Sequence, residues 1–279
     1  MSPLGYYYPA IRLRPIVRQK IIESKADVAL VFWAPEGLAA TYSIGTVPKL
    51  AYYGMADPSS ARARIEDAEL FSGRRPNWLA LKMSRKSIRE WERSYLALMM
   101  DCDVVSTLGK DQAEYYARKG HPRAIYMPNM WPDLSAGEHA RHRQLESGER
   151  PRIIGSLGNP ATTANTYGLW YIGKELLPRL DAELGPDGYE LHIFGSGEPN
   201  KSVRKLLETS PGVRMRGWVD EIDEEIRSAH VFLLANNAAR YKGPHTRILH
   251  AWSLKACCVA YSYLASTIPE VVDGENVLL

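Results

Sequence analysis

The stretch YKGPHTRILHAW at 241–252 combines residue types that can bind an anion. His245, Thr246 and Arg247 stand where an apolar helical pattern begins, just after a glycine and a proline. The free N–H groups at the start of a helix attract anions, and a guanidinium group can hold a phosphate through two hydrogen bonds. His250 follows Arg247 by three residues, so both side chains can face one crevice. The stretch therefore predicts a site for a nucleotide diphosphate, and the alternative is that Thr246 only caps the helix.

Small residues end three other apolar runs in the second half of the chain. They are the segments GSLG at 155–158, GSG at 195–197 and GW at 217–218. Small side chains let backbone N–H groups come close to a ligand, and ligands of parallel sheets bind where the strands end. Each segment alone is explained by a turn. Four such ends in one sheet favour a shared ligand site.

The elements that must position these residues alternate between strands and helices. The apolar runs of the first half predict strands at 26–33, 48–54, 102–108 and 123–129 and helices at 86–100 and 110–120. Those of the second half predict strands at 152–156, 189–197, 213–217, 230–235 and 257–262 and helices at 166–184, 201–209, 219–229 and 246–256. This alternation is typical of parallel sheets that helices cover on both faces. We therefore expect an α/β protein with two Rossmann-like αβα domains that face each other across a cleft.

The polar, charged stretch at 133–150 marks the expected boundary between the domains. We place an N-terminal Rossmann-like domain at 1–135, a connector at 136–150 and a C-terminal Rossmann-like domain at 151–279. The first 150 residues hold 22 basic and 17 acidic residues, whereas the rest hold 13 and 15. The asymmetry is compatible with an anionic acceptor or a membrane surface, although scattered solvated charge explains it as well.

Composition excludes several classes of protein. The net charge of +3 is too small to indicate a nucleic-acid partner. Three cysteines, two of them adjacent, give no disulfide framework and no zinc spacing, which favours a reducing cytoplasm. No apolar run reaches the roughly 18 residues that span a membrane, and the first residues lack the apolar core of a signal peptide. The D-x-D triplet at 101–103 precedes a strand instead of following it, so we expect no metal site there.

The order of the segments resembles a known family. HIFGSGEP, VRMRGWVDEIDEEIRSAHVFLL, TRILHAWSLKACCVAYSYLASTIPEVVDGENVLL and the earlier DVVSTLGKDQAEYYARKGHPRAIYMPN are similar to glycosyltransferases of family 4 with the GT-B fold. The resemblance covers about residues 100 to 279. It implies transfer of a sugar from a nucleotide-sugar donor, with retention and without a metal or other cofactor. It also implies that the N-terminal domain at 1–135 is the acceptor side and is reduced. The C-terminal domain at 151–279 would bind the nucleotide sugar, and we expect it to lack the final helices that in the family cross back to the N-terminal domain.

The resemblance assigns roles to individual positions. The loop at 155–159 would face the donor diphosphate, 195–197 would line the nucleotide, and 218–219 would contact the base. The turn at 243–247 would hold phosphate and sugar, and His250 would lie near the ribose. The expected donor-binding residues are thus Gly155, Ser156, Gly158, Asn159, Gly195, Ser196, Gly197, Trp218, Val219, Lys242, Gly243, His245, Thr246, Arg247 and His250. Asp57 and Arg62, after the second predicted strand, are expected on the acceptor side.

The chain departs from the family at two glutamates that are usually eight residues apart. Lys242 and His250 occupy these positions, so no catalytic residue is assigned. The expected function is a cytoplasmic hexosyltransferase-like enzyme of polysaccharide biosynthesis that acts on a glycan or a lipid-linked acceptor. Peripheral contact of its N-terminal domain with the inner face of a membrane is a further expectation. The alternatives are a nucleotide-sugar epimerase and a non-catalytic homologue that binds a nucleotide or a partner enzyme.

Overall fold

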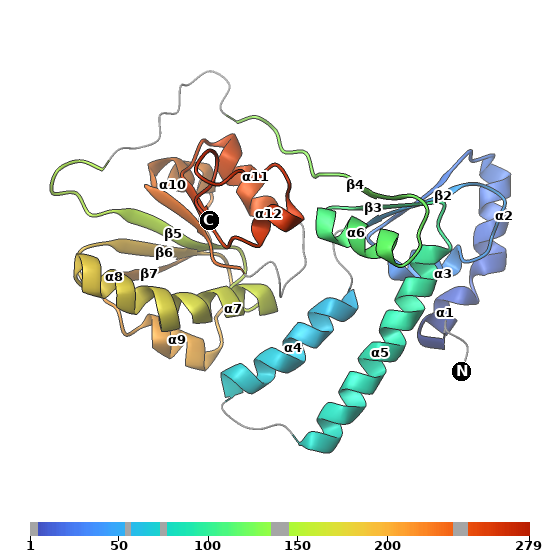
Figure 1. Ribbon diagram of the computed structural model, residues 1–279, viewed down its shortest axis with the longest axis horizontal. Helices are drawn as coiled ribbons and strands as arrows, with labels where there is room; N and C mark the ends of the chain where they lie inside the picture. The colour runs from blue at the N-terminus through green and yellow to red at the C-terminus, as the bar shows by residue number, and fades with distance from the viewer. Residues whose placement is uncertain (1–4, 54–56, 73–76, 135–144, 237–244) are drawn as a thin grey trace.

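The structure, a computed structural model, describes residues 5–53, 57–72, 77–134, 145–236 and 245–279. Two parallel sheets form its framework (Figure 1). The first has the order β1-β2-β3-β4 and the second the order β7-β6-β5-β8-β9. Their strands are β1 (Ala29–Phe32), β2 (Lys49–Tyr53), β3 (Val104–Thr107), β4 (Ala124–Tyr126), β5 (Arg152–Leu157), β6 (Glu190–Phe194), β7 (Val213–Gly217), β8 (Val231–Leu234) and β9 (Cys258–Ala260). The predicted strands are thus confirmed, with ends that differ by a few residues.

Helices connect the strands and pack on the sheets. The first half holds a 3-10 turn at Gly5–Tyr7, α1 (Tyr8–Ile11), α2 (Arg14–Ser24), α3 (Pro35–Ala40), α4 (Asp57–Ser72), α5 (Trp78–Met100) and α6 (Lys110–Arg118). The second half holds α7 (Thr163–Tyr171), α8 (Leu177–Leu184), α9 (Lys201–Leu207), α10 (Ile222–Ser228), α11 (Thr246–Ser253) and α12 (Leu264–Thr267), with a π-helical turn at Ile172–Leu176 between α7 and α8.

The first sheet buries one face and leaves part of the other open. Val31, Ala51 and Val105 are paired in register on neighbouring strands and pack into a core with residues of α3 and α5. Leu30 and Phe32 of β1 point the opposite way, and each is 60% exposed. The prediction that helices cover both faces is therefore wrong for β1 of this sheet, because no described helix packs over these two side chains.

The second sheet is covered on both faces. Consecutive residues of β5 enter different cores: Ile153 packs with α7 and α9, whereas Ile154 packs with α10 and α11. From β5 the chain winds to β6 and β7 on one side, and β8 and β9 lie on the other. The order in which the chain adds strands reverses between β5 and β8. A crevice for ligands forms at the carboxyl ends of strands at such a point.

Two sets of contacts join the halves of the molecule. Helix α4 leaves the first half and packs against α7 and α9 (Figure 1), where Phe71 meets the Trp170 ring at 6.4 Å between centroids. The short helix α12 packs against α6, and the Tyr126 hydroxyl donates a 2.8 Å hydrogen bond to Glu270. The two sheets are separate, as expected, while the predicted domain boundaries stay a prediction.

Candidate functional site

The start of α11 follows β8, which lies beside the point between β5 and β8 where the strand order reverses. His245 occupies the N-cap in the left-handed conformation, with φ 43° and ψ 37°, and no side chain among the described residues caps the helix. The alternative in which Thr246 is the cap is wrong, because Thr246 is already the first helical residue. The first N–H groups of a helix have no partner within it, so this uncapped end offers donors to a ligand.

Two nitrogen-bearing side chains are buried at this helix start. Burial lowers the pKa of Arg247 to about 10, and no carboxylate among the described residues forms an ion pair with it. Burial and the nearby Arg247 charge lower the pKa of His245 to about 4, and its Nε2 is buried with no hydrogen-bond partner in the described chain. A buried cation without a counter-ion costs free energy that a bound anion would offset. The arrangement therefore favours a negatively charged ligand.

The loop after β5 lies directly beside Arg247. Gly158 has φ +105°, and its N–H donates a 3.0 Å hydrogen bond to Phe194 O at the end of β6. A Cβ atom at this position would lie 3.5 Å from Arg247 Nη2 and from Asn165 Nδ2. The loop after β5, the end of β6 and the start of α11 thus meet at one place, as the sequence predicts.

The loop after β6 fits closely against the loop after β5. A Cβ atom on Gly195, whose φ is +131°, would lie 2.2 Å from Gly158 O. One on Gly197 would lie 2.6 Å from Asn159 Oδ1. Gly195 is required because the backbones of the two loops approach each other, and Gly197 is favoured because its φ is +109° and the Asn159 side chain lies close.

Several of the expected donor residues have another local explanation. Gly155 and Ser156 lie inside β5, and a Cβ atom on Gly155 would lie 2.5 Å from Leu191 of β6, so packing accounts for this glycine. The Asn159 side-chain oxygen accepts a 2.8 Å hydrogen bond from the N–H of Ala161 within its own loop. Ser196 is exposed. Their part in binding stays a prediction.

The expected base-contacting residues follow β7. The Trp218 side chain is 72% exposed, and its Nε1 donates a hydrogen bond of 3.2 Å to Asp220. Val219 is partly buried against the core that α10 and α11 share. The indole ring is thus available at the surface, while Val219 anchors the segment.

His250 faces α10. Its Nε2 lies 2.7 Å from an Asp223 carboxylate oxygen, and its ring stacks with Trp131 at 4.9 Å between centroids. A carboxylate therefore lies beside the position where the family resemblance implies a glutamate. Lys242 and Gly243, the other expected residues of this turn, lie outside the described residues.

Two asparagines beside Arg247 were missed by the sequence analysis. Asn165 is buried, donates to Asn159 O at 2.8 Å and lies 3.3 Å from Asn236. With its amide oxygen facing Arg247, Asn236 accepts from Nη1 at 3.3 Å. Neither residue belongs to a motif, because their positions follow only from the packing of α7 against the end of β8.

The expected acceptor-side residues lie at the start of α4. Asp57 is its first residue, and its side chain is outside what the structure describes. Arg62 forms an ion pair with Glu92 of α5 and borders a cavity of about 320 Å³, which Tyr115, Asp111 and Tyr263 also line. The Asp111 charge opposes part of the lowering of the His245 pKa, so this cavity lies close to the start of α11.

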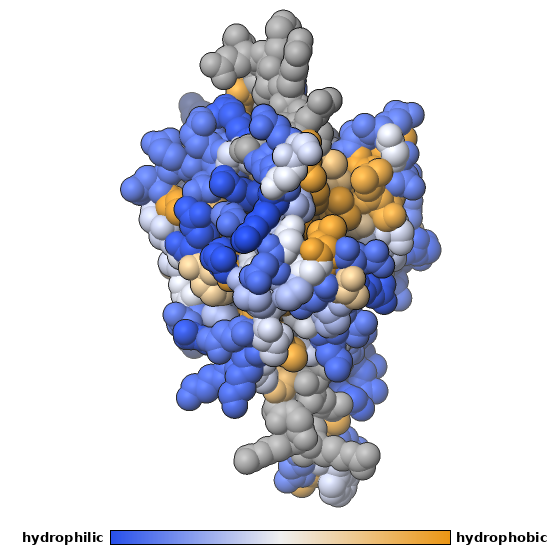
Figure 2. Space-filling view, turned by 90° about the vertical axis from the view of Figure 1, so that its left-hand side faces the viewer, coloured by the Kyte–Doolittle hydropathy of each residue, from blue (hydrophilic) through white to orange (hydrophobic). Residues whose placement is uncertain are grey.

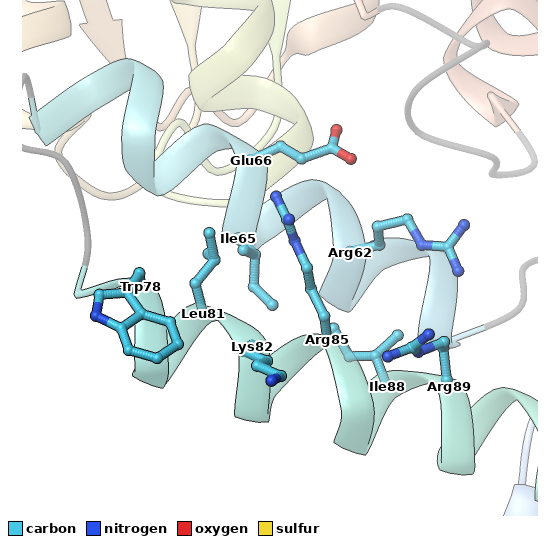
Figure 3. Close-up of a pocket in the computed structure, with 9 residues that line it drawn as sticks. All are labelled: Arg62, Ile65, Glu66, Trp78, Leu81, Lys82, Arg85, Ile88 and Arg89. Atoms are coloured by element: carbon cyan, nitrogen blue, oxygen red, sulfur yellow. The ribbon is translucent and has the colours of Figure 1, made fainter.

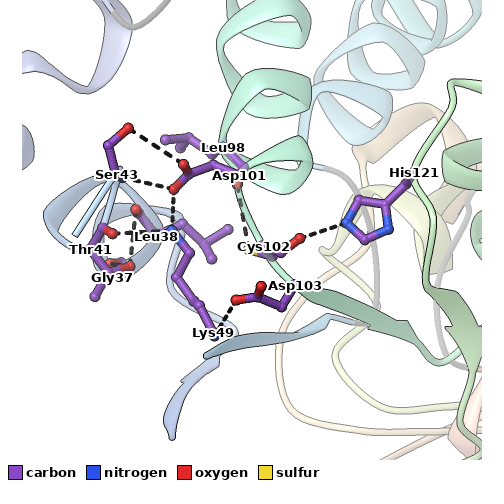
Figure 4. A network of polar contacts seen from close by, with 10 residues as sticks. All are labelled: Gly37, Leu38, Thr41, Ser43, Lys49, Leu98, Asp101, Cys102, Asp103 and His121. Atoms are coloured by element: carbon purple, nitrogen blue, oxygen red, sulfur yellow. Dashed lines mark hydrogen bonds and ion pairs between the residues drawn. The ribbon is translucent and has the colours of Figure 1, made fainter. Parts of the chain in front are cut away.

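The D-x-D triplet has structural partners (Figure 4). Asp101 accepts a 2.9 Å hydrogen bond from the Ser43 N–H and forms an ion pair with the buried Lys49 ammonium group. Asp103 accepts from the Lys49 N–H at 2.7 Å. Both carboxylates thus hold the amino ends of β2 and β3 together. They lie at the end of the sheet opposite to the carboxyl ends of its strands.

Part of the chain matches a known family in sequence. Residues 151–279, slightly under half of the chain, match the family described as Glycosyl transferases group 1. No curated protein matches the chain in sequence.

Solved structures have a similar fold over most of the chain. The apo lipopolysaccharide outer core galactosyltransferase WaaB is similar with a TM-score of 0.59 at 12% identity, over 92% of this chain and 62% of its own. An α,α-trehalose-phosphate synthase (UDP-forming) from Burkholderia vietnamiensis is similar with a TM-score of 0.57 at 9% identity, over 93% and 65%. At these identities the likeness concerns the fold, and the chain spans less than two thirds of the length of these structures.

Proposed function

We propose that the chain is a glycosyltransferase, because residues 151–279 match the group 1 glycosyl transferases and the molecule has the GT-B fold. The chain transfers a sugar from a nucleotide-sugar donor to a glycan or lipid-linked acceptor, in the biosynthesis of a polysaccharide. The transfer is independent of metal and retains the configuration of the sugar. The donor is held by the second sheet, and the acceptor approaches from the first half.

One observation supports the donor site above all. Arg247 is buried without a carboxylate partner among the described residues, at the uncapped start of α11 and beside the Gly158 backbone. A diphosphate at this place would accept hydrogen bonds from the guanidinium group and from the first N–H groups of α11. Its charge would replace the counter-ion that Arg247 lacks.

The same groups supply the chemistry that departure of the nucleotide needs. When the bond between the sugar and the diphosphate breaks, negative charge develops on the leaving oxygen. Donors that are already in position stabilise such charge without reorganising, and they act more strongly where water is excluded. Arg247 and the start of α11 are placed for this role. His245, whose pKa is lowered to about 4, stays neutral near pH 7 and can donate or accept one hydrogen bond.

The acceptor is proposed to enter through the cavity of about 320 Å³ beside Arg62. Tyr115 and Tyr263 are partly exposed at its border, and tyrosine rings can stack on the faces of sugars. A lipid-linked acceptor would require the chain to work at a membrane. Among the described helices, none is both long and apolar enough to cross one, so such contact would be peripheral.

Donor turnover tests the proposal. The full chain is incubated with nucleotide sugars that differ in base and in sugar, and release of nucleoside diphosphate is measured with and without glycan acceptors. We expect one donor to be consumed, and its consumption to fall at least tenfold in Arg247→Ala. The proposal would be wrong if no nucleoside diphosphate bound and no donor were consumed.

A non-catalytic nucleotide-binding homologue is the second candidate. Lys242 and His250 stand where the resemblance implies two glutamates, and His250 is engaged by Asp223. The same assay separates the two functions, because tight binding of a nucleoside diphosphate without consumption of any donor would favour the second.

A further inference from the structure

The first half of α5 is a basic and apolar surface. Residues 78–89 contain four cations and no carboxylate. The cations are Lys82, Arg85, Lys86 and Arg89, and all four are exposed. Three large apolar side chains of the same segment are also exposed, Trp78 by 71%, Leu79 by 50% and Met83 by 66%. Exposed apolar side chains among cations on one helix are typical of helices that lie in a membrane interface.

The cations of this surface have no counter-charge among the described residues. None of the four forms an ion pair or a side-chain hydrogen bond with another residue in the described ranges of the chain. Lys82 and Lys86 are spaced i,i+4, as are Arg85 and Arg89, and like charges at this spacing destabilise a helix. A binding role explains a charge pattern that folding alone disfavours.

A groove between α5 and α4 adds apolar surface to the cations. It has a volume of about 620 Å³, and Ile65, Leu81 and Ile88 contribute apolar side chains to it. Arg85 extends from α5 across this groove toward α4 (Figure 3). Among the described residues that border the groove, Glu66 is the one carboxylate. Cations thus outnumber carboxylates around an apolar space, which suits a negatively charged headgroup with its attached acyl chain.

The surface lies where it can reach a partner without obstruction. Helices α4 and α5 form a hairpin that projects from the two sheets, and Trp78 begins α5 at the far end of the hairpin (Figure 1). Seen from the side, the hairpin forms the narrow lower end of the molecule, away from the broad hydrophilic face of the upper part (Figure 2). A flat partner could therefore contact the hairpin first.

We propose that the first half of α5 binds the surface of a bilayer that contains anionic phospholipids. Lys82, Lys86 and their neighbouring arginines contact phosphate groups, while Trp78, Leu79 and Met83 enter the interface between headgroups and acyl chains. This surface is separate from the start of α11, so membrane binding does not depend on sugar transfer. The three apolar side chains favour a bilayer over a nucleic acid, whose backbone offers them no apolar contact.

Sedimentation with vesicles tests the proposal. The full chain should sediment with vesicles of phosphatidylcholine mixed with phosphatidylglycerol and stay in solution with phosphatidylcholine alone. Each cation near an anionic bilayer strengthens binding roughly fivefold, so Lys82→Ser/Lys86→Ser should lower the partition coefficient about 20-fold. The matched control Lys174→Ser/Arg179→Ser removes two exposed cations near α8 and should change it little. Circular dichroism and melting should match the unchanged chain, since all four side chains are exposed.

Fluorescence locates the apolar contact. Lipids with brominated acyl chains should quench part of the tryptophan emission. This quenching should be absent in Trp78→Phe. Equal binding to neutral vesicles, or equal losses in the α5 variant and its control, would overturn the proposal. A duplex oligonucleotide that binds more tightly than the anionic vesicles, and whose binding the α5 variant alone loses, would also overturn it and indicate a nucleic-acid partner.

Discussion

His245 combines two unfavourable features at the start of α11. Its backbone is in the left-handed region, which costs a residue with a side chain about 1–2 kcal/mol. Its ring is buried with Nε2 unpaired among the described residues, and burial lowers its pKa to about 4. Strain of this kind often marks a functional site. The sequence places a histidine here but does not reveal its conformation, because a left-handed backbone at a residue with a side chain depends on tertiary packing.

The lowered pKa of His245 predicts a pH-dependent stability. The unfolded chain binds a proton near pH 6.5 and the folded chain only near pH 4, so protonation favours unfolding between these values. The free energy of unfolding should fall by about 2 kcal/mol between about pH 7 and pH 5 on account of this residue. His245→Asn, which tolerates the left-handed conformation, should remove that part of the dependence in urea unfolding. An unchanged difference between the two pH values would contradict the burial of the ring.

At the scale of elements, most strands follow from apolar runs, whereas several helices do not. The helix expected at 166–184 is divided into α7 and α8 by a π-helical turn. Pro178, near the start of α8, lacks the N–H that a continuous helix would use, and its ring would clash with the preceding turn. Helix α4 has no strong apolar periodicity, so no pattern predicts it; packing against α5, α7 and α9 stabilises it instead. Tertiary contacts override local preference in both cases.

The close approach of the loops after β5 and β6 predicts a strong effect of one methyl group. Gly195→Ala would place Cβ 2.2 Å from Gly158 O, so the two loops must separate. We expect a loss of about 1–3 kcal/mol in stability from overpacking, together with a loss of nucleoside diphosphate binding. Gly185→Ala is the matched control, because Gly185 also has positive φ but no atom lies within 4 Å of its added Cβ. Urea unfolding and calorimetry measure both effects, and equal losses in the two variants would contradict the arrangement.

At the scale of the whole molecule, the pattern of alternating elements predicts two parallel sheets and the place where their ligand sites would form. It does not predict that α4 crosses to the second sheet, nor that the first sheet is partly uncovered, since both depend on which helices exist and where they pack. Leu30 and Phe32 are exposed on adjacent outward positions of β1. Exposed apolar patches on a sheet are prone to association.

At this scale we predict that the molecule self-associates through the face of β1 that carries Leu30 and Phe32. The chain should elute as more than a monomer in size-exclusion chromatography with light scattering, and Leu30→Thr/Phe32→Thr should shift it toward the monomer, because threonine suits a strand but is polar. Ile16→Ser/Ile22→Ser on α2 removes two side chains of similar exposure and should have less effect. A monomer at all concentrations would show that the open face does not associate.

The central claim is that a diphosphate binds at the start of α11, and calorimetry of Arg247→Ala tests it most directly. Loss of a charge-assisted hydrogen bond costs about 1.5–3 kcal/mol, so affinity for the preferred nucleoside diphosphate should fall about tenfold or more. Affinity for the nucleoside without phosphates should barely change, whereas His250→Ala should weaken both ligands. Arg204→Ala, an exposed arginine on α9, should alter neither. If Arg247→Ala leaves the diphosphate affinity intact, the start of α11 is not the donor site.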